Sequence, residues 1–307
     1  MFAPLQGYTE AEYRLTHARV YGPAGRADAY FTPFIRLEKG NLRSKDRRQL
    51  ERIAGREDQV VQVIFNGADE LSTLLRLIGD LQFRRIDLNS GCPFSPQVRH
   101  GRGAGILTEA GCADVAPVIR QFHERGFRFS VKMRLGTDSP DDWRGCIETL
   151  NSMPLEYVTM HPRTARQQYS GRLDFGQFED FMRMCSHPVV FNGEIHTRHD
   201  IINIVERYPT LHGVMIGRGA LARPSIFTEY RNGEDMPPDI RQRNIGNLYR
   251  GVADYLGAQL CGEVQLLTKL KPFWEYLEDE LTHPVAKAIR KAGKLSRYEA
   301  ALPPWTR

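Results

Sequence analysis

Residues 112–134 read CADVAPVIRQFHERGFRFSVKMR and join a helix pattern directly to a strand pattern. Apolar side chains recur with helical spacing over Cys112–Arg125, and a short run in which apolar residues flank the cations follows over Ser130–Arg134. A helix that leads into such a strand is one repeating unit of an α/β fold. The same alternation recurs on both sides of this segment, so the pattern predicts a repeated α/β architecture.

Eight short β-branched or apolar runs predict eight strands. They are Phe2–Leu5, Asp28–Thr32, Val60–Phe65, Ile86–Asn89, Ser130–Arg134, Tyr157–His161, Val189–Asn192 and Gly213–Ile216. Helical periodicity separates most of them, as in Ala68–Gly79, Cys112–Arg125, Trp143–Ser152, Phe175–Cys185 and Thr197–Tyr208. This alternation is what a (β/α)8 TIM barrel requires. A doubly wound sheet is the competing architecture, but residues 6–9 read QGYT and lack its GxGxxG fingerprint.

The pattern changes after the predicted barrel. Residues 232–238 read NGEDMPP, which is typical of a linker. Only helical periodicity follows, over Arg241–Leu260, Glu263–Leu281 and Val285–Lys294. We therefore expect a barrel domain over residues 1–235 and a small all-α helical domain over residues 236–307.

Composition limits the class of protein. The chain has 307 residues, of which 41% are hydrophobic and 26% charged, and it contains no apolar run long enough to span a membrane. The N-terminus lacks a signal-peptide pattern. Five scattered cysteines without CxxC spacing argue against a disulfide framework and a zinc site, so we expect a cytoplasmic protein. We also expect a monomer without a membrane partner. The net charge of +5 is compatible with a polyanionic partner but does not require one.

Polar groups follow the ends of successive predicted strands, where barrels collect functional residues. They are Gln62, Asn89, Cys92, Lys132, Arg134, His161, Arg163, Asn192, Gly193, Glu194, Gly217, Arg218 and Gly219. The last two strand ends contain glycine turns whose backbone N–H groups can approach a phosphate, although tight turns alone would also need glycine. Lys132 and His161 lie on adjacent strands, so we expect them to hold the polar edge of a cofactor. No carboxylate–histidine cluster has ligand spacing, so we expect no metal.

Cys92 lies in residues 88–93, LNSGCP, and is followed by a basic, glycine-rich loop at residues 98–105, VRHGRGAG. A cysteine at a strand end between glycine and proline is expected at the surface of a cleft. For the other four cysteines, a buried inert thiol is the better interpretation. Cys92 could act as a thiolate nucleophile or as a thiol acid.

Several motifs in register resemble those of the tRNA-dihydrouridine synthases. They are Ala3–Thr9 (APLQGYT), Val61–Gln62, Asp87–Pro93 (DLNSGCP), Gly101–Leu107, Val131–Gly136 (VKMRLG), His161–Gly171, Asn192–Ile195 (NGEI) and Met215–Ala220 (MIGRGA). The helical tail is also similar to the C-terminal domain of that family. The chain departs from the family pattern at residues 94–97, FSPQ, where many members carry a lysine.

The resemblance implies an FMN-dependent barrel that reduces a uridine in tRNA to 5,6-dihydrouridine and uses NADPH to reduce the flavin again. Hydride would pass from flavin to C6, and Cys92 would donate a proton to C5, which requires a thiol that is protonated near neutral pH. Asn89, Arg134 and Arg163 would position the substrate. FMN contacts are implied for Pro4, Leu5, Gln62, Lys132, His161, Asn192, Gly193, Glu194, Gly217 and Arg218.

The tail contains a candidate RNA surface. Residues 269–276 read KLKPFWEY and interleave basic and aromatic side chains. Lys269 and Lys271, with Arg99 near the predicted cleft, are candidate phosphate contacts, which would make the tail an RNA-binding domain and the barrel the FMN-binding domain. A solvated helix face with aromatic residues in the core is the competing interpretation.

Two other functions stay open. A flavoenzyme of the dihydroorotate or dihydropyrimidine dehydrogenase type also places an Asn-x-x-Cys-Pro loop near FMN, but acts on a free pyrimidine. The basic tail and the string HPRT at residues 161–164 favour the RNA enzyme over that alternative. The third hypothesis is a non-enzymatic RNA-binding module on a degenerate barrel, which would bind no flavin.

Overall fold

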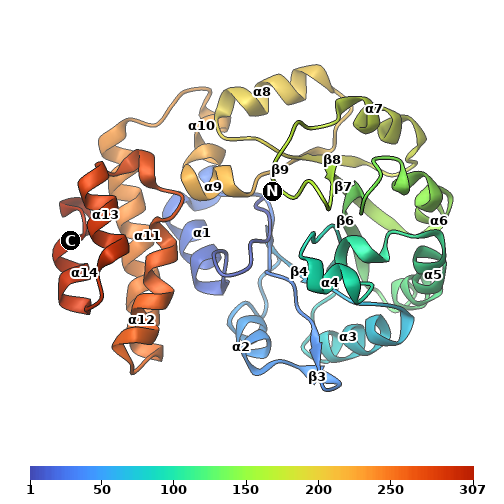
Figure 1. Ribbon diagram of the computed structural model, residues 1–307, viewed down its shortest axis with the longest axis horizontal. Helices are drawn as coiled ribbons and strands as arrows, with labels where there is room; N and C mark the ends of the chain where they lie inside the picture. The colour runs from blue at the N-terminus through green and yellow to red at the C-terminus, as the bar shows by residue number, and fades with distance from the viewer.

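The computed structural model describes residues 1–307 and is organised around a curled parallel sheet of seven strands (Figure 1). In sheet order these are β1 (Tyr30–Phe31), β4 (Gln59–Val63), β5 (Arg85–Ser90), β6 (Arg128–Gly136), β7 (Leu155–Thr164), β8 (Val189–Asn192) and β9 (Gly213–Met215). Seven of the eight predicted strands are therefore confirmed with small shifts of their bounds. All neighbouring pairs are parallel, so the carboxyl ends of the strands lie on one side of the sheet.

The predicted first strand, Phe2–Leu5, is wrong as a complete strand. Phe2 alone makes parallel bridges, one to β1 and one to the residue after β9, and so joins the two edges of the sheet. Pro4 has no N–H to donate, and the N–H of Leu5 donates to the Thr9 hydroxyl at 2.8 Å, so the chain turns away after the bridge. The prediction of an α/β fold with a curled parallel sheet is confirmed, but the sheet has seven strands and not the eight of a complete (β/α)8 barrel, and its edges meet only at Phe2.

Helices cover the outside of the sheet between its strands (Figure 1). In α3, apolar side chains at helical spacing (Leu71, Leu74, Leu75 and Ile78) are all buried, as the periodicity predicts. A small hairpin, β2 (Leu37–Glu38) with β3 (Asn41–Leu42), was not expected from the sequence pattern. The helices are α1 (Ala11–Gly25), α2 (Ser44–Arg52), α3 (Ala68–Asp80), α4 (Ser95–Arg99), η1 (Gly103–Ile106), α5 (Glu109–His123), η2 (Asp142–Cys146), α6 (Ile147–Ser152), α7 (Phe175–Met184) and α8 (Arg198–Arg207).

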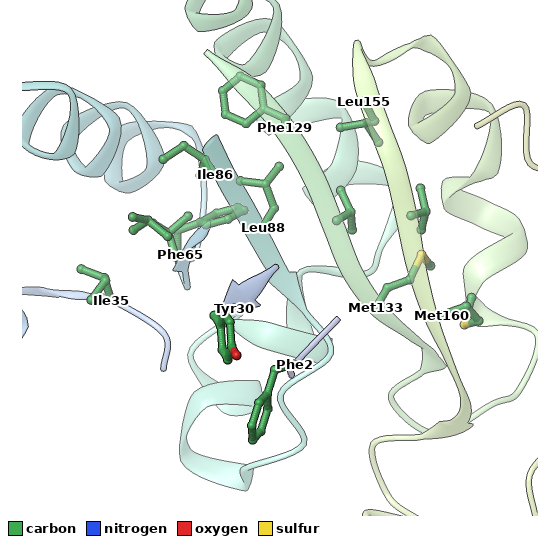
Figure 2. Close-up of a cluster of buried hydrophobic side chains, with 14 of the residues drawn as sticks. Phe2, Tyr30, Ile35, Phe65, Ile86, Leu88, Phe129, Met133, Leu155 and Met160 are labelled. Carbon is green, nitrogen blue, oxygen red and sulfur yellow. The ribbon is translucent and has the colours of Figure 1, made fainter. Parts of the chain in front are cut away.

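Strand side chains divide between an apolar and a polar environment. In β5, Ile86 and Leu88 belong to the main hydrophobic core, where Figure 2 shows them near Phe129 of the neighbouring strand β6. Side chains alternate along a strand, so the intervening Asp87 and Asn89 point to the opposite face, inside the curl of the sheet. Both are buried, and this polar interior forms the floor of the candidate site.

The chain after β9 is helical. A second hydrophobic cluster holds the last helices together, and within it the Trp274 indole N–H donates to the Tyr298 hydroxyl at 2.9 Å. The longest of these helices, α11 (Pro238–Gln259), lies beside α1 (Figure 1). The helices are α9 (Arg218–Ala222), α10 (Ile226–Asn232), α11 (Pro238–Gln259), α12 (Glu263–Leu270), η3 (Lys271–Trp274), η4 (Glu278–Glu280), α13 (His283–Lys291), α14 (Leu295–Ala301) and η5 (Pro304–Thr306).

The position of the domain boundary near residue 236 stays a prediction.

No helix in the structure combines the length and the hydrophobicity that crossing a bilayer requires.

Candidate active site

A cleft opens at the carboxyl ends of the strands and collects most of the predicted site residues. The strand register contributes directly, because Asn89 of β5 pairs with Lys132 of β6, and Arg134 of β6 pairs with His161 of β7. The predicted residues that line the cleft are Pro4, Leu5, Gln62, Asn89, Cys92, Lys132, Arg134, His161, Asn192, Gly193, Glu194, Gly217 and Arg218.

A chain of buried hydrogen bonds fixes the floor of this cleft. Asn89 Nδ2 donates to Gln62 Oε1 at 2.8 Å, and Gln62 Nε2 donates to Asp87 Oδ2 at 2.7 Å. The Ser130 hydroxyl donates to Asp87 Oδ1 at 2.6 Å. Burial raises the pKa of Asp87 to about 6. The Asp87 carboxylate therefore orients the amide of Gln62, which in turn orients Asn89.

Backbone contacts determine where the Cys92 thiol lies. Asn89 Oδ1 accepts the N–H of Cys92 at 2.9 Å, and the carbonyl oxygen of Cys92 accepts the N–H of Ala104 at 3.1 Å. Gly103 has a φ of 59°, and a Cβ there would lie 2.7 Å from Cys92 Cβ. The glycine of the loop after Cys92 is thus needed for close packing against the cysteine.

The Cys92 thiol is held in its protonated form by its surroundings. Burial raises the pKa of Cys92, while the backbone at Phe94 and the nearby Arg134 and Lys132 act in the opposite direction. The two cations favour the thiolate, which a proton donor does not need. Desolvation of the thiol has the larger effect, so the pKa of Cys92 is raised overall. The thiol is therefore suited to donate a proton at neutral pH rather than to attack as a thiolate.

Lys132 and His161 both line the cleft. Burial lowers the pKa of Lys132 to about 8, and its ammonium makes no hydrogen bond or ion pair within the protein. Burial also keeps the pKa of His161 well below its ordinary value, so the imidazole is neutral. Its Nε2 lies 3.5 Å from Arg163 Nη1. A partly buried ammonium without a partner fits an anionic or electron-rich ligand.

The glycine turns after β8 and β9 form a corner of the cleft with free hydrogen-bond donors. The backbone N–H groups of Gly193, Glu194, Ile195 and Gly217 donate to no acceptor in the protein. All four residues line the cleft. Unpaired N–H groups next to the Arg218 guanidinium match the requirements of a phosphate group.

A family model described as dihydrouridine synthase matches residues 1–295 of this chain. The chain belongs to the dihydrouridine synthase family. Proteins named probable tRNA-dihydrouridine synthase from Helicobacter pylori and Aquifex aeolicus are 27% and 26% identical to it, each over 79% of this chain and over 73% and 76% of theirs. A Bacillus subtilis relative, named probable tRNA-dihydrouridine synthase 2, is 25% identical over 74% of this chain and 70% of its own.

Solved structures with a similar fold include an old yellow enzyme and a morphinone reductase. The old yellow enzyme from Trypanosoma cruzi has a TM-score of 0.53 and 9% identity, covering 78% of this chain and 90% of its own. Morphinone reductase has a TM-score of 0.50 and 10% identity, covering 78% of this chain and 88% of its own. At these identities the similarity concerns the fold alone, and it supports the curled-sheet architecture.

Two arginines predicted to contact substrate are hydrogen-bonded to the protein's own loops. Arg134 donates to the carbonyl oxygen of Gly91 at 2.9 Å and to that of Gln168 at 2.7 Å. Arg163 donates from Nη2 to the Gly171 carbonyl oxygen at 2.7 Å and from Nη1 to Glu194 at 2.6 Å. In this state both guanidinium groups fix loop positions at the cleft.

The three predicted RNA-binding cations lie outside the cleft. Arg99 and Lys269 are exposed, and Lys269 borders a smaller cavity between the N-terminal loop and the helical tail. Lys271 donates to the carbonyl oxygen of Arg290 at 3.1 Å and so caps the end of α13. Trp274, in the same basic and aromatic segment, is buried in the helical core, as the competing interpretation expected.

Several residues of the site were not assigned a role from the sequence patterns. Asp87 lies within the quoted motif but was not assigned a role, and only its buried contacts reveal one. Tyr169, 49% exposed at the cleft, lies under the guanidinium of Arg218 at 4.5 Å from the ring centroid. His196 follows the NGEI motif and contacts Glu194. The available sequence signal for Tyr169 was an aromatic residue inside the motif at residues 161–171.

Proposed function

We propose that this protein reduces a specific uridine of tRNA to 5,6-dihydrouridine, with FMN as its flavin and NADPH as the source of electrons. The observation that carries this proposal is the Cys92 thiol, which lines the cleft, is fixed by Asn89 and keeps its proton at neutral pH. The names of the curated relatives support tRNA as the substrate.

The residues present fit FMN. The unpaired ammonium of Lys132, the ordered amide of Gln62 and the neutral imidazole of His161 would contact the flavin ring. The free N–H groups at residues 193–195 and 217 would receive its phosphate, with Arg218 nearby. Pro4 and Leu5 would border the ring, because they line the same cleft.

The chemistry requires a hydride at one carbon and a proton at its neighbour. FMN held by these residues would supply the hydride for C6 of the uracil, with NADPH as the source of its electrons. Reduction at C6 places negative charge on the enolate formed by C5 and the C4 carbonyl, so a proton must reach C5. The Cys92 thiol donates this proton, and the resulting thiolate takes up a proton from solvent. Asn89 holds the Cys92 backbone through Oδ1, and the amide N–H that it does not donate to Gln62 would meet the edge of the base.

The target base must leave its RNA stack to reach such a cleft. Arg99, Lys269 and Lys271 are the proposed contacts to the RNA backbone, and the tail from residue 236 is the proposed RNA-binding domain. Arg134 and Arg163 would act on the substrate through the loops that they hold. A cytoplasmic location is consistent with a tRNA substrate.

The experiment loads the protein with FMN, reduces it anaerobically with NADPH, and adds unmodified tRNA. Oxidation of the flavin together with one dihydrouridine per tRNA, detected by mass spectrometry, supports the proposal. Oxidation by orotate with no response to tRNA would instead identify a free-pyrimidine enzyme. A protein that cannot be loaded with FMN would refute both flavoenzyme hypotheses.

A further inference from the structure

Glu194 is a carboxylate in the part of the cleft that otherwise collects cations and free N–H groups. Its Oε1 accepts from Arg163 Nη1 at 2.6 Å and from Arg218 Nη2 at 3.0 Å. Its Oε2 lies 3.1 Å from His196 Nε2. Two arginines outnumber the single carboxylate, so this corner keeps a positive charge. Glu194 therefore links the two arginines, and the net charge of this part of the cleft stays positive.

The backbone at Glu194 has a conformation that most side chains avoid. Its φ is 43°, and the φ of the preceding Gly193 is 148°. Left-handed backbone is disfavoured for residues other than glycine and asparagine, so another interaction must hold Glu194 there. In this conformation the N–H groups of residues 193, 194 and 195 have no acceptor in the protein, and all three residues line the cleft.

The partners of the Glu194 carboxylate are themselves fixed. Arg163 is 4% exposed and donates from Nε and Nη2 to the Gly171 carbonyl oxygen at 3.2 and 2.7 Å. Arg218 lies over the Tyr169 ring, with its guanidinium carbon 4.5 Å from the centroid. The carboxylate is thus anchored to the end of β7 through Arg163 and to the start of α9 through Arg218, and it connects both to the loop after β8.

We propose that Glu194 is a positioning residue that holds the loop at residues 193–195 in the conformation whose N–H groups bind the phosphate of the flavin cofactor. The inference rests on the FMN assignment of the proposed function. A positioning role and a purely electrostatic role predict opposite changes in phosphate affinity when Glu194 is removed. Removal of a negative charge beside an anion site should strengthen phosphate binding, whereas removal of a brace should weaken it.

The test compares two ligands that share a ring but differ in the phosphate. FMN and riboflavin are titrated into the apoprotein, and binding is followed by flavin fluorescence. The variants are Glu194→Ala and Glu194→Gly, because glycine adopts positive φ without a side-chain penalty. The matched control is Glu206→Ala, which removes an exposed carboxylate of α8 that makes no hydrogen bond or ion pair.

We expect Glu194→Ala to weaken FMN binding about tenfold and to leave riboflavin affinity unchanged, because only the phosphate contacts depend on the loop. Glu194→Gly should bind FMN more tightly than Glu194→Ala does, and the Glu206 variant should match the wild type. Unchanged riboflavin affinity also shows that the cleft of each variant is folded.

Two results would overturn the inference while the FMN assignment stands. One is FMN affinity in Glu194→Ala that equals or exceeds the wild-type value. The other is an equal loss of affinity for FMN and riboflavin, which would indicate general damage to the cleft. Failure of the wild-type protein to bind FMN would instead refute the proposed function itself.

Discussion

Replacement of Gly103 by alanine should displace Cys92, the proposed acid, while leaving its thiol group intact. A Cβ at residue 103 would lie 2.7 Å from both Cys92 Cβ and the Cys92 carbonyl oxygen, and the φ of Gly103 is 59°. The left-handed conformation costs an alanine about 1–2 kcal/mol, and overpacking adds about 1–3 kcal/mol. We therefore expect Gly103→Ala to lower the free energy of unfolding by about 2–5 kcal/mol.

Gly101→Ala is the matched control, because it lies in the same loop with a φ of 67° and its Cβ would meet only Asn66 Cβ, at 4.0 Å. It should cost only the conformational part, about 1–2 kcal/mol. Both free energies can be measured by urea unfolding.

The two variants should differ more in their rates of dihydrouridine formation than in their free energies of unfolding. A displacement of about 1 Å in a reacting group can cost about 100-fold in rate. We expect that loss in single-turnover dihydrouridine formation by Gly103→Ala, with NADPH-dependent flavin reduction retained. Dihydrouridine formation at the same rate in Gly103→Ala and Gly101→Ala would refute the reasoning.

Three further predictions follow from the pKa values at the site. Burial raises the pKa of Cys92, so dihydrouridine formation should stay level through neutral pH and fall as the pH rises through the thiol's pKa; a rate that climbs into alkaline solution would contradict the acid role. The pKa of Lys132 is lowered to about 8, so FMN affinity should fall above that pH, and Lys132→Met should weaken binding about tenfold and remove the pH dependence in a fluorescence titration. Burial raises the pKa of Asp87 from 3.8 to about 6, so its contribution to stability is present below pH 3.8 and is lost as the pH rises through 6. Asp87→Asn should remove this loss, about 3 kcal/mol, from unfolding curves measured between pH 4 and pH 7, and parallel curves for the two proteins would show that Asp87 is not the source.

Much of the fold could be predicted because the strands carry a local signal. The runs Ser130–Arg134 and Val189–Asn192 combine β-branched or apolar residues with a following helix pattern, and both are strands in the structure. The failure at Phe2–Leu5 has a physical reason. Whether an N-terminal run pairs over its full length depends on where the two edges of the sheet meet. In the folded chain they meet at Phe2, and the residues after it form no further bridges.

The site was predictable where neighbouring parallel strands place polar residues in register, as Asn89 does with Lys132 and Arg134 with His161. The partners of each polar group were not predictable in the same way. Asp87 orients Gln62 from inside the sheet, and Arg134 donates to loop carbonyl oxygens whose positions depend on the complete fold. Sequence patterns identify which groups are available, whereas packing decides which of them are already engaged.

The most direct test of the central claim is a single-turnover measurement on Cys92→Ala. The variant is loaded with FMN, reduced with NADPH, and mixed anaerobically with unmodified tRNA. We predict flavin reduction at the wild-type rate and a fall of at least about 100-fold in dihydrouridine formation, because the proton donor for C5 is absent. Dihydrouridine formation at the wild-type rate would contradict the assignment of Cys92 as the acid.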